Sequence, residues 1–60
     1  MKRQYAAARL LELGPLLFSD FMEITGWPRS TCKWVLKELR LAGMVERREV
    51  SQRIFVYARV

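Results

Sequence analysis

The side chains of this 60-residue chain that could do chemistry are mostly cations and hydroxyls. The sequence has no His and one Cys, so it lacks His-based acid–base groups, an intrachain disulfide and the usual Cys/His zinc ligands. It has 11 Lys and Arg residues, whose side chains suit phosphate and other anions. Several side chains that could contact a binding partner lie close together in the sequence: Arg29, Ser30, Thr31, Lys33, Trp34 and Lys37. These residue types therefore favour binding of an anion over catalysis.

The excess of positive charge lies in the second part of the chain. Residues 1–26 carry three basic and three acidic residues, whereas residues 27–60 carry eight basic and three acidic ones, which is the whole net charge of +5. A positive field restricted to one segment favours an anionic partner there, with nucleic acid ahead of a membrane. The alternative is that the charge only keeps a small protein soluble.

Length limits what the chain can be. About 60% of the unfolded surface is buried in a domain of this size, which leaves room for one thin core and no enclosed substrate cavity. We expect a single domain over residues 1–60 that is not an enzyme and takes no cofactor, metal or small-molecule ligand. The N-terminus lacks the apolar stretch of a signal peptide, so we expect a cytoplasmic protein.

Strong helix formers predict a first helix over residues 2–13, capped by Gly14 and stopped by Pro15. Its apolar face consists of Ala7, Ala8, Leu10, Leu11 and Leu13. Residues 16–18 are an apolar triplet that favours a brief strand. A second helix of about two turns is predicted from Ser19, as its N-cap, to Thr25.

The third helix is predicted from about Pro28 to Ala42, with Gly43 as its C-terminal cap. Its buried stripe has the spacing i, i+3, i+4 and i+7: Cys32, Val35, Leu36 and Leu39. The buried Cys32 is then an inert apolar residue. The opposite, outward face carries Arg29, Ser30, Lys33, Trp34 and Lys37.

Residues 45–50 and 53–58 predict two antiparallel strands joined at Ser51-Gln52. A two-residue turn without Gly or Asn suits the favoured hairpin types poorly, so a longer loop or a bulge is expected. We expect four aromatic residues in the core: Phe18, Phe21, Phe55 and Tyr57. The other face of the last strand is apolar as well, through Ile54, Val56, Ala58 and, beyond it, Val60. A homodimer or a protein partner would bury that surplus.

This order of elements is that of a winged helix-turn-helix domain, an α+β fold. It has three helices, a C-terminal β-hairpin wing and a short extra strand between the first two helices. Residues 14–48 resemble the DNA-binding core of MarR-like and ArsR-like bacterial regulators. The shared pattern is Gly26 between the short helices, Ser30-Thr31 in the first turn of the third, then Leu-Lys-Glu-Leu at 36–39 and Ala-Gly-Met-Val-Glu-Arg at 42–47.

Two residues depart from the pattern. Pro28 replaces the usual Ser or Thr cap of the recognition helix, and Trp27 replaces a smaller aliphatic residue, where we expect it to serve packing. These departures affect the predicted start of the third helix, and with it how far Arg29 and Ser30 reach.

What the resemblance implies is sequence-specific binding of double-stranded DNA by a small transcriptional regulator. The third helix would enter the major groove, where base edges are distinguishable. Arg29 is the candidate for a bidentate guanine contact, and Lys33 and Lys37 for bases or phosphates. Ser30 and Thr31 suit phosphate or helix-start hydrogen bonds. Trp34 suits a thymine methyl group, a sugar-phosphate or a partner chain.

The wing would lie on the phosphate backbone or in the minor groove through Arg47, Arg48 and Arg53. The alternative role of these arginines is to protect an edge strand from aggregation. By the resemblance we expect a repressor of prokaryote, phage or plasmid type, dimeric through the last strand or the first helix. Two other functions stay open: a winged-helix protein-interaction module within a larger assembly, and an RNA-binding module.

Overall fold

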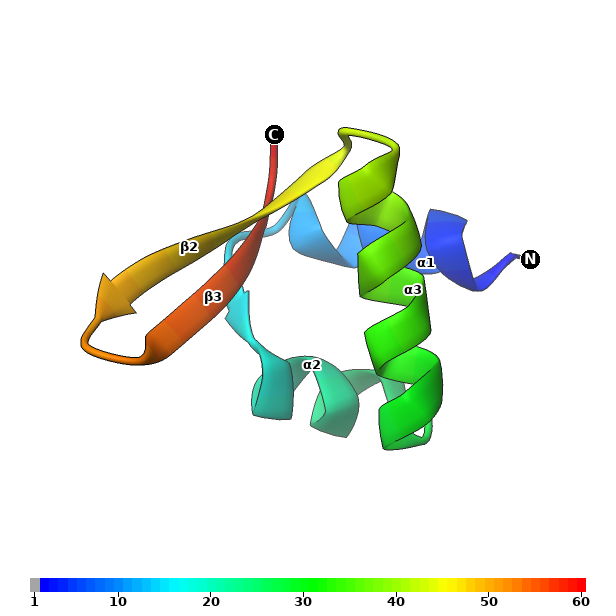
Figure 1. Ribbon diagram of the computed structural model, residues 1–60. Coiled ribbons are helices and arrows are strands. Elements are labelled where there is room, and N and C mark those ends of the chain that lie inside the picture. Colours follow the sequence, from blue (N-terminus) through cyan, green and yellow to red (C-terminus); the bar gives the residue numbers. More distant parts are fainter. Residues whose placement is uncertain (1) are drawn as a thin grey trace.

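The computed structural model describes residues 2–60, which form three helices and a three-stranded antiparallel sheet (Figure 1). The chain order is α1 (Arg3–Leu11), β1 (Leu16–Leu17), α2 (Phe18–Thr25), α3 (Arg29–Leu41), β2 (Val45–Ser51) and β3 (Ile54–Arg59). The predicted α+β winged-helix arrangement is confirmed.

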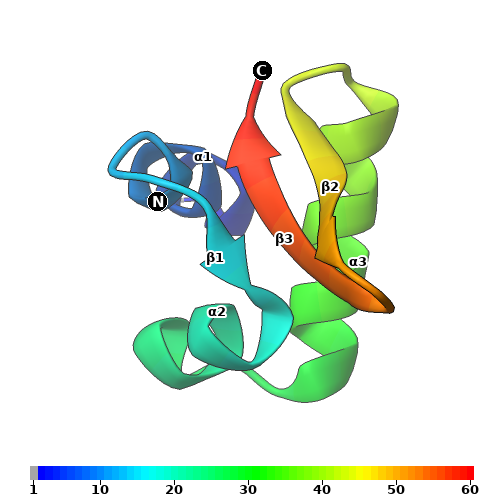
Figure 2. The ribbon, with the colours of Figure 1, turned by 90° about the vertical axis from the view of Figure 1, so that its left-hand side faces the viewer.

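The sheet has the strand order β1-β3-β2, so the last strand lies in the middle (Figure 2). In the registers, Leu16 of β1 lies opposite Tyr57, and Val45 of β2 lies opposite Arg59. Strand β1 thereby ties the α1–α2 connection to the middle of β3. The distal part of the hairpin projects away from the helices as the wing (Figure 1).

The core collects apolar residues from all three helices and from β2. It contains Ala7, Ala8, Leu11, Phe21, Cys32, Val35, Leu36, Leu39 and Val45. The predicted buried stripe of α3 is confirmed, and Cys32 is fully buried. Burying a Leu or Phe side chain stabilises a fold by about 1.5–3 kcal/mol, so this cluster is the main source of stability. It fixes which face of α3 points outward.

Helix α1 ends earlier than predicted. It stops at Leu11, and Leu13 is 86% exposed, so its expected place on the apolar face was wrong. The backbone tightens here, because the N–H groups of Leu13 and Gly14 donate to the carbonyls of Leu10 and Leu11, three residues back. Pro15 also disfavours helical geometry at the residue before it.

Helix α2 begins two residues before the predicted start. Its N-cap is Leu17 and not Ser19, because pairing of Leu17 with Val56 of β3 holds the Leu17 backbone extended. Ser19 lies inside the first turn. Gly26 ends α2 in the left-handed conformation with φ of 70°, as the sequence indicates.

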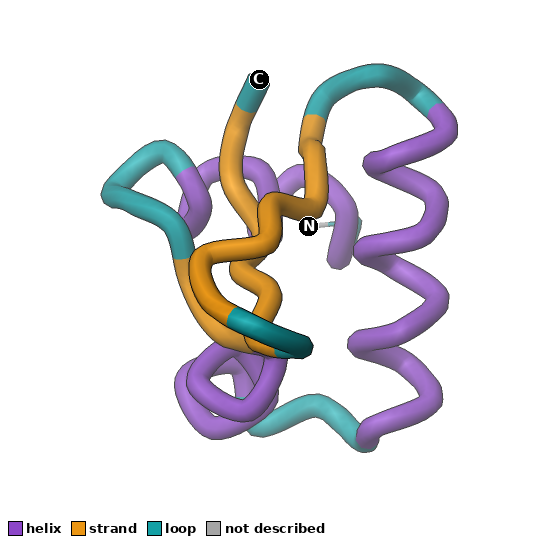
Figure 3. The backbone as a smooth tube through the Cα atoms, turned by 60° about the vertical axis from the view of Figure 1, so that its left-hand side comes forward, coloured by secondary structure: helices purple, strands orange, loops and turns teal. Residues whose placement is uncertain are grey.

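The hairpin tip carries the predicted irregularity (Figure 3). Glu49 pairs with Phe55 and Ser51 pairs with Ile54, so Val50 is an extra residue on β2. The turn lies one residue later than predicted, at Gln52 and Arg53. Arg53 has φ of 60°, and its N–H donates to the Glu49 carboxylate at 3.2 Å.

The four aromatic residues predicted to be core differ in burial. Phe21 is fully buried, and Phe18 and Tyr57 are half-buried and pack against the core. Phe55 is half-buried and lies outside the core cluster, because it sits further along the projecting wing.

The apolar surplus on β3 is smaller than the sequence suggests. Ala58 is buried within the chain and Val56 is half-buried, which leaves Ile54 and Val60 exposed. Among residues 2–60, no helix has the length and hydropathy needed to cross a membrane.

Candidate nucleic-acid interface

One flank of α3 is a continuous basic stripe. Arg29, Lys33, Lys37 and Arg40 follow one another at spacings of four, four and three residues, which places them along one side of a helix. All four are exposed. We call these four residues the basic stripe. It runs the length of α3 on the side that faces the wing.

The wing meets the basic stripe at a shallow hollow of about 620 Å³. Lys37 and Arg40 line it from α3, and Arg47 and Glu46 line it from β2. Three cations and one acidic residue therefore line this hollow. This hollow carries a surplus of positive charge and suits an anion that contacts both α3 and the wing.

Two of the arginines rest on aromatic rings. The guanidinium carbon of Arg29 lies 5.6 Å from the centre of the Phe18 ring, and that of Arg47 lies 4.5 Å from the centre of the Phe55 ring. Phe18, Phe55, Arg47 and Arg53 also line a second hollow, of about 330 Å³, at the base of α2 and the wing. Cation–π contact leaves the edge N–H donors of a guanidinium free for other partners.

The wing separates two adjacent arginines that were both predicted to contact DNA. Successive residues of a strand point to opposite faces, so Arg48 does not share the face of Arg47. The Arg48 guanidinium forms an ion pair with the Glu46 carboxylate. Arg48 is also absent from the hollows that Arg47 lines. The structure therefore brings Arg47 and Arg53 toward the helices and leaves Arg48 on the other side.

The remaining predicted residues of α3 lie around the stripe. Ser30 is exposed on the outward face, whereas Thr31 is half-buried. Trp34 is 50% exposed and lies three residues after Thr31, on the flank that faces α1. The structure thus places Trp34 away from Arg47 and the wing.

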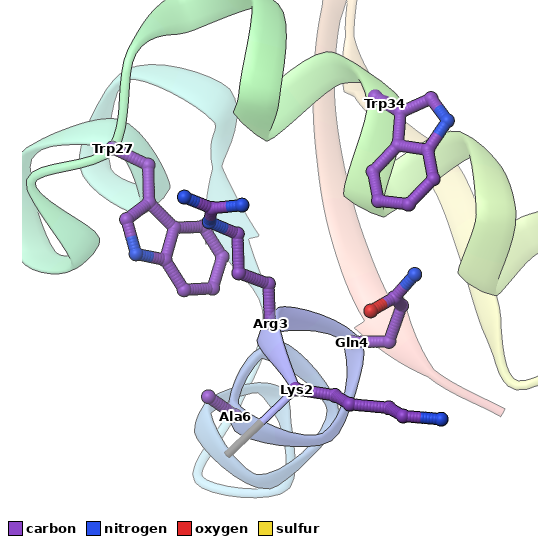
Figure 4. Close-up of a pocket in the computed structure, with 6 residues that line it drawn as sticks. All are labelled: Lys2, Arg3, Gln4, Ala6, Trp27 and Trp34. Carbon is purple, nitrogen blue, oxygen red and sulfur yellow. The ribbon is translucent and has the colours of Figure 1, made fainter.

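On that flank a third hollow, of about 510 Å³, separates α3 from the first turn of α1 (Figure 4). It is lined by Lys2, Arg3, Gln4, Ala6, Trp27 and Trp34. The guanidinium carbon of Arg3 lies 6.0 Å from the centre of the Trp27 ring. Trp27 is half-buried and packs edge-on against Phe21, with 6.0 Å between the centres of the two rings, which confirms its expected packing role.

The turn from α2 to α3 is held by side-chain bonds in place of a Ser or Thr cap. The Thr25 hydroxyl donates to the Phe21 carbonyl at 2.8 Å and accepts from the Trp27 N–H at 3.3 Å. Pro28 is the N-cap of α3 without a side-chain cap bond, and the Cys32 N–H donates to its carbonyl at 3.0 Å. These bonds fix where α3 begins, and with it the position of Arg29.

Three basic residues near these hollows were not among the predicted site residues. Arg40 completes the stripe and could have been found by continuing the helical spacing of three or four residues beyond Lys37. Lys2 and Arg3 are distant in sequence, and only the packing of α1 on α3 brings them to Trp34. Across residues 2–60, no three His, Cys, Asp or Glu side chains gather as metal ligands would.

Most of the chain matches a known protein family. The family model described as "Sugar-specific transcriptional regulator TrmB" matches residues 4–60. No curated protein and no solved structure matches the chain. The family has a winged-helix DNA-binding domain, so the resemblance seen in the sequence is confirmed.

Proposed function

The chain belongs to the TrmB family of sugar-specific transcriptional regulators, a family that binds DNA, and we propose that it binds double-stranded DNA through α3 and the wing. A transcriptional regulator family implies a protein that is not an enzyme. In the proposed complex α3 lies in the major groove, and the wing lies on the phosphate backbone or in the adjacent minor groove.

The observation that carries this proposal is the convergence of the basic stripe with Arg47. A helix in the major groove has a sugar-phosphate backbone beside it, and the hollow between Lys37, Arg40 and Arg47 is the place for that backbone. Phosphates that are neutralised by basic side chains release their counterions, so the affinity for DNA would fall steeply as the salt concentration rises. The partition of charge in the sequence points to the same part of the chain.

We assign individual roles from position. Arg29 and Ser30, in the first turn of α3, reach for base edges and a nearby phosphate, and Thr31 serves the helix start. Lys33 and Lys37 neutralise phosphates or contact bases. Trp34 packs on the sugar-phosphate or a thymine methyl group. Arg47 and Arg53 hold the wing on the DNA, with Arg48 as a weaker contributor.

A repressor acting as a homodimer, as the sequence predicts, is part of this proposal. Ile54 and Val60 are exposed at the two ends of the C-terminal strand. The dimer through that strand or the first helix stays a prediction. The family description names sugars, and the expectation that this chain takes no small-molecule ligand stays a prediction.

The test is binding of random-sequence duplex DNA, measured by fluorescence anisotropy at about 50 and 200 mM salt, the range over which six to ten phosphate contacts cost roughly 10³–10⁵ in affinity. The double variant Lys33→Ala/Lys37→Ala should lose most binding at either salt concentration. Arg9→Ala/Arg59→Ala is the control of equal charge. Arg9 is an exposed arginine of α1 that pairs with Glu12 at 3.4 Å, and the guanidinium of Arg59, at the far end of β3, donates to the Met44 carbonyl. Absence of binding at low salt, or equal effects of both variants, contradicts the proposal.

An apolar surface favours the protein-interaction module as a second candidate. Leu13 and the exposed Ile24 border a hollow of about 210 Å³ that Leu10, Pro15 and Leu16 also line. This function would leave duplex binding weak and unaffected by substitutions in the basic stripe.

The same anisotropy assay with double-stranded RNA separates the RNA-binding alternative, which requires RNA to bind more tightly than DNA.

A further inference from the structure

The hollow between α1 and α3 lies on the flank of α3 opposite the wing. In Figure 1 the wing extends to one side of α3 and the start of α1 lies on the other. Lys2 and Arg3 approach this hollow from α1, and Trp34 borders it from α3 (Figure 4). Nothing in the sequence pattern of the recognition helix includes these two cations.

A helix in the major groove has two backbones beside it, because the groove is about 12 Å wide and each of its edges is a phosphate strand. The basic stripe and Arg47 take one of these edges. The flank of α3 that carries Trp34 then faces the other edge. Phosphates stand higher than the groove floor, so residues set back from α3 are the ones that reach them.

The lining of this hollow fits phosphate. It contains two cations and an amide, from Lys2, Arg3 and Gln4, and no carboxylate. In the part of the chain that the structure describes, the ion pairs join Arg9 to Glu12 and Arg48 to Glu46. Neither Lys2 nor Arg3 is paired with a carboxylate there, so both can bind a phosphate. The contact of Arg3 with the Trp27 ring holds its guanidinium at the edge of the hollow.

We propose that Lys2 and Arg3 form a second phosphate-binding edge, which contacts the DNA strand across the major groove from the strand contacted by the basic stripe and Arg47. The half-exposed Trp34 indole lies between this edge and the groove and packs on the deoxyribose of that strand. Residues 1–26, although neutral in sum, thus take part in DNA binding. This inference rests on the proposed function.

The first experiment measures affinity for a duplex selected by the wild-type chain from random-sequence DNA. Arg3→Ala removes one phosphate-binding cation and should lower the salt slope by about 1, so the affinity ratio between about 50 and 200 mM salt shrinks by about fourfold. Arg9→Ala removes the same charge from the same helix and should leave the ratio unchanged. Arg3→Lys keeps the charge and should restore the salt slope.

The second experiment locates the contact. Uncharged methylphosphonates replace short blocks of phosphates at successive positions of either strand. Wild-type affinity should fall when a block covers a contacted phosphate. Arg3→Ala should lose its response to a block on one strand, and Arg47→Ala to a block across the major groove on the other strand.

The outcomes separate the two proposals. If the wild-type chain does not bind duplex DNA, the proposed function fails. If it binds with steep salt dependence while Arg3→Ala behaves like Arg9→Ala, only the second edge is overturned. The second edge is also overturned, and the proposed function kept, if Arg3→Ala and Arg47→Ala lose their response to the same methylphosphonate block. A normal circular dichroism spectrum of Arg3→Ala excludes loss of folding as the cause of its effect.

Discussion

Arg47 and Arg48 are adjacent in sequence but lie on opposite faces of the wing. The Arg47 guanidinium stacks on Phe55 and lines a hollow together with Lys37 of α3, whereas the Arg48 guanidinium pairs with Glu46. The alternation of a β-strand is the cause. Of the two equal charges, only one is directed toward the recognition helix.

Arg47→Ala should therefore weaken duplex binding more than Arg48→Ala. We expect the salt slope to fall by about 1 for Arg47→Ala and by much less for Arg48→Ala, because a slope reports phosphate contacts. The two variants have the same net charge, so each is the control for the other. Anisotropy titrations at several salt concentrations measure the slopes, and equal losses would show that the wing acts only through its total charge.

The two tryptophans should report DNA binding differently. In Trp27→Phe the remaining emission comes from Trp34, whose half-exposed indole faces the proposed interface, so duplex DNA should quench it strongly. In Trp34→Phe the emission comes from the half-buried Trp27, and the change should be smaller. Steady-state fluorescence titrations compare the two, with poly-glutamate as an anionic control. A larger response from Trp27 would place Trp34 outside the interface.

Leu36 and Leu13 test the packing of the helices. Leu36→Ala should lower the free energy of unfolding by about 2–5 kcal/mol, because it empties a fully buried site, whereas Leu13→Ala should change it by less than about 0.5 kcal/mol. Urea unfolding followed by circular dichroism gives both values. A cost above about 1 kcal/mol for Leu13→Ala would mean that α1 continues past Leu11 in solution.

Gly26 tests the turn between α2 and α3. Its φ of 70° is unfavourable for a residue with a Cβ, and apart from Gly26 and its two chain neighbours no atom lies within 4 Å of the place an added Cβ would take. The cost of Gly26→Ala is then conformational alone, at about 1–2 kcal/mol in the free energy of unfolding. Gly26→Asn should cost less, since Asn tolerates this region. Thermal unfolding of both variants checks the order, and equal costs would point to a steric origin.

Much of this architecture could be predicted because its signals are local. Buried Cys32 and Leu36, and exposed Lys33 and Lys37, each recur at the four-residue spacing of a helix, and this spacing determined both faces of α3. Gly26 and Gly43 marked the ends of their helices for the same reason. The opposite placement of Arg47 and Arg48 also follows from strand alternation once Val45 is known to be buried, although both were predicted to contact DNA.

The rest depends on contacts between distant segments. Ser19 has the right chemistry for an N-cap, but pairing of Leu17 with Val56 starts α2 earlier. Leu13 continues the apolar spacing of α1, but the chain turns toward Pro15 before reaching it. Lys2 and Arg3 come beside Trp34 only through packing of α1 on α3, which no spacing within either helix reveals.

Three arginines of this small domain, Arg3, Arg29 and Arg47, rest on the rings of Trp27, Phe18 and Phe55. A free arginine side chain loses about 1.5–2 kcal/mol of rotamer entropy when it is immobilised. Aromatic contacts restrict these side chains before any ligand arrives, so less of that entropy remains to be lost on binding. A surface whose long side chains are already ordered can bind tightly with a small contact area, which is an advantage for a domain of this size.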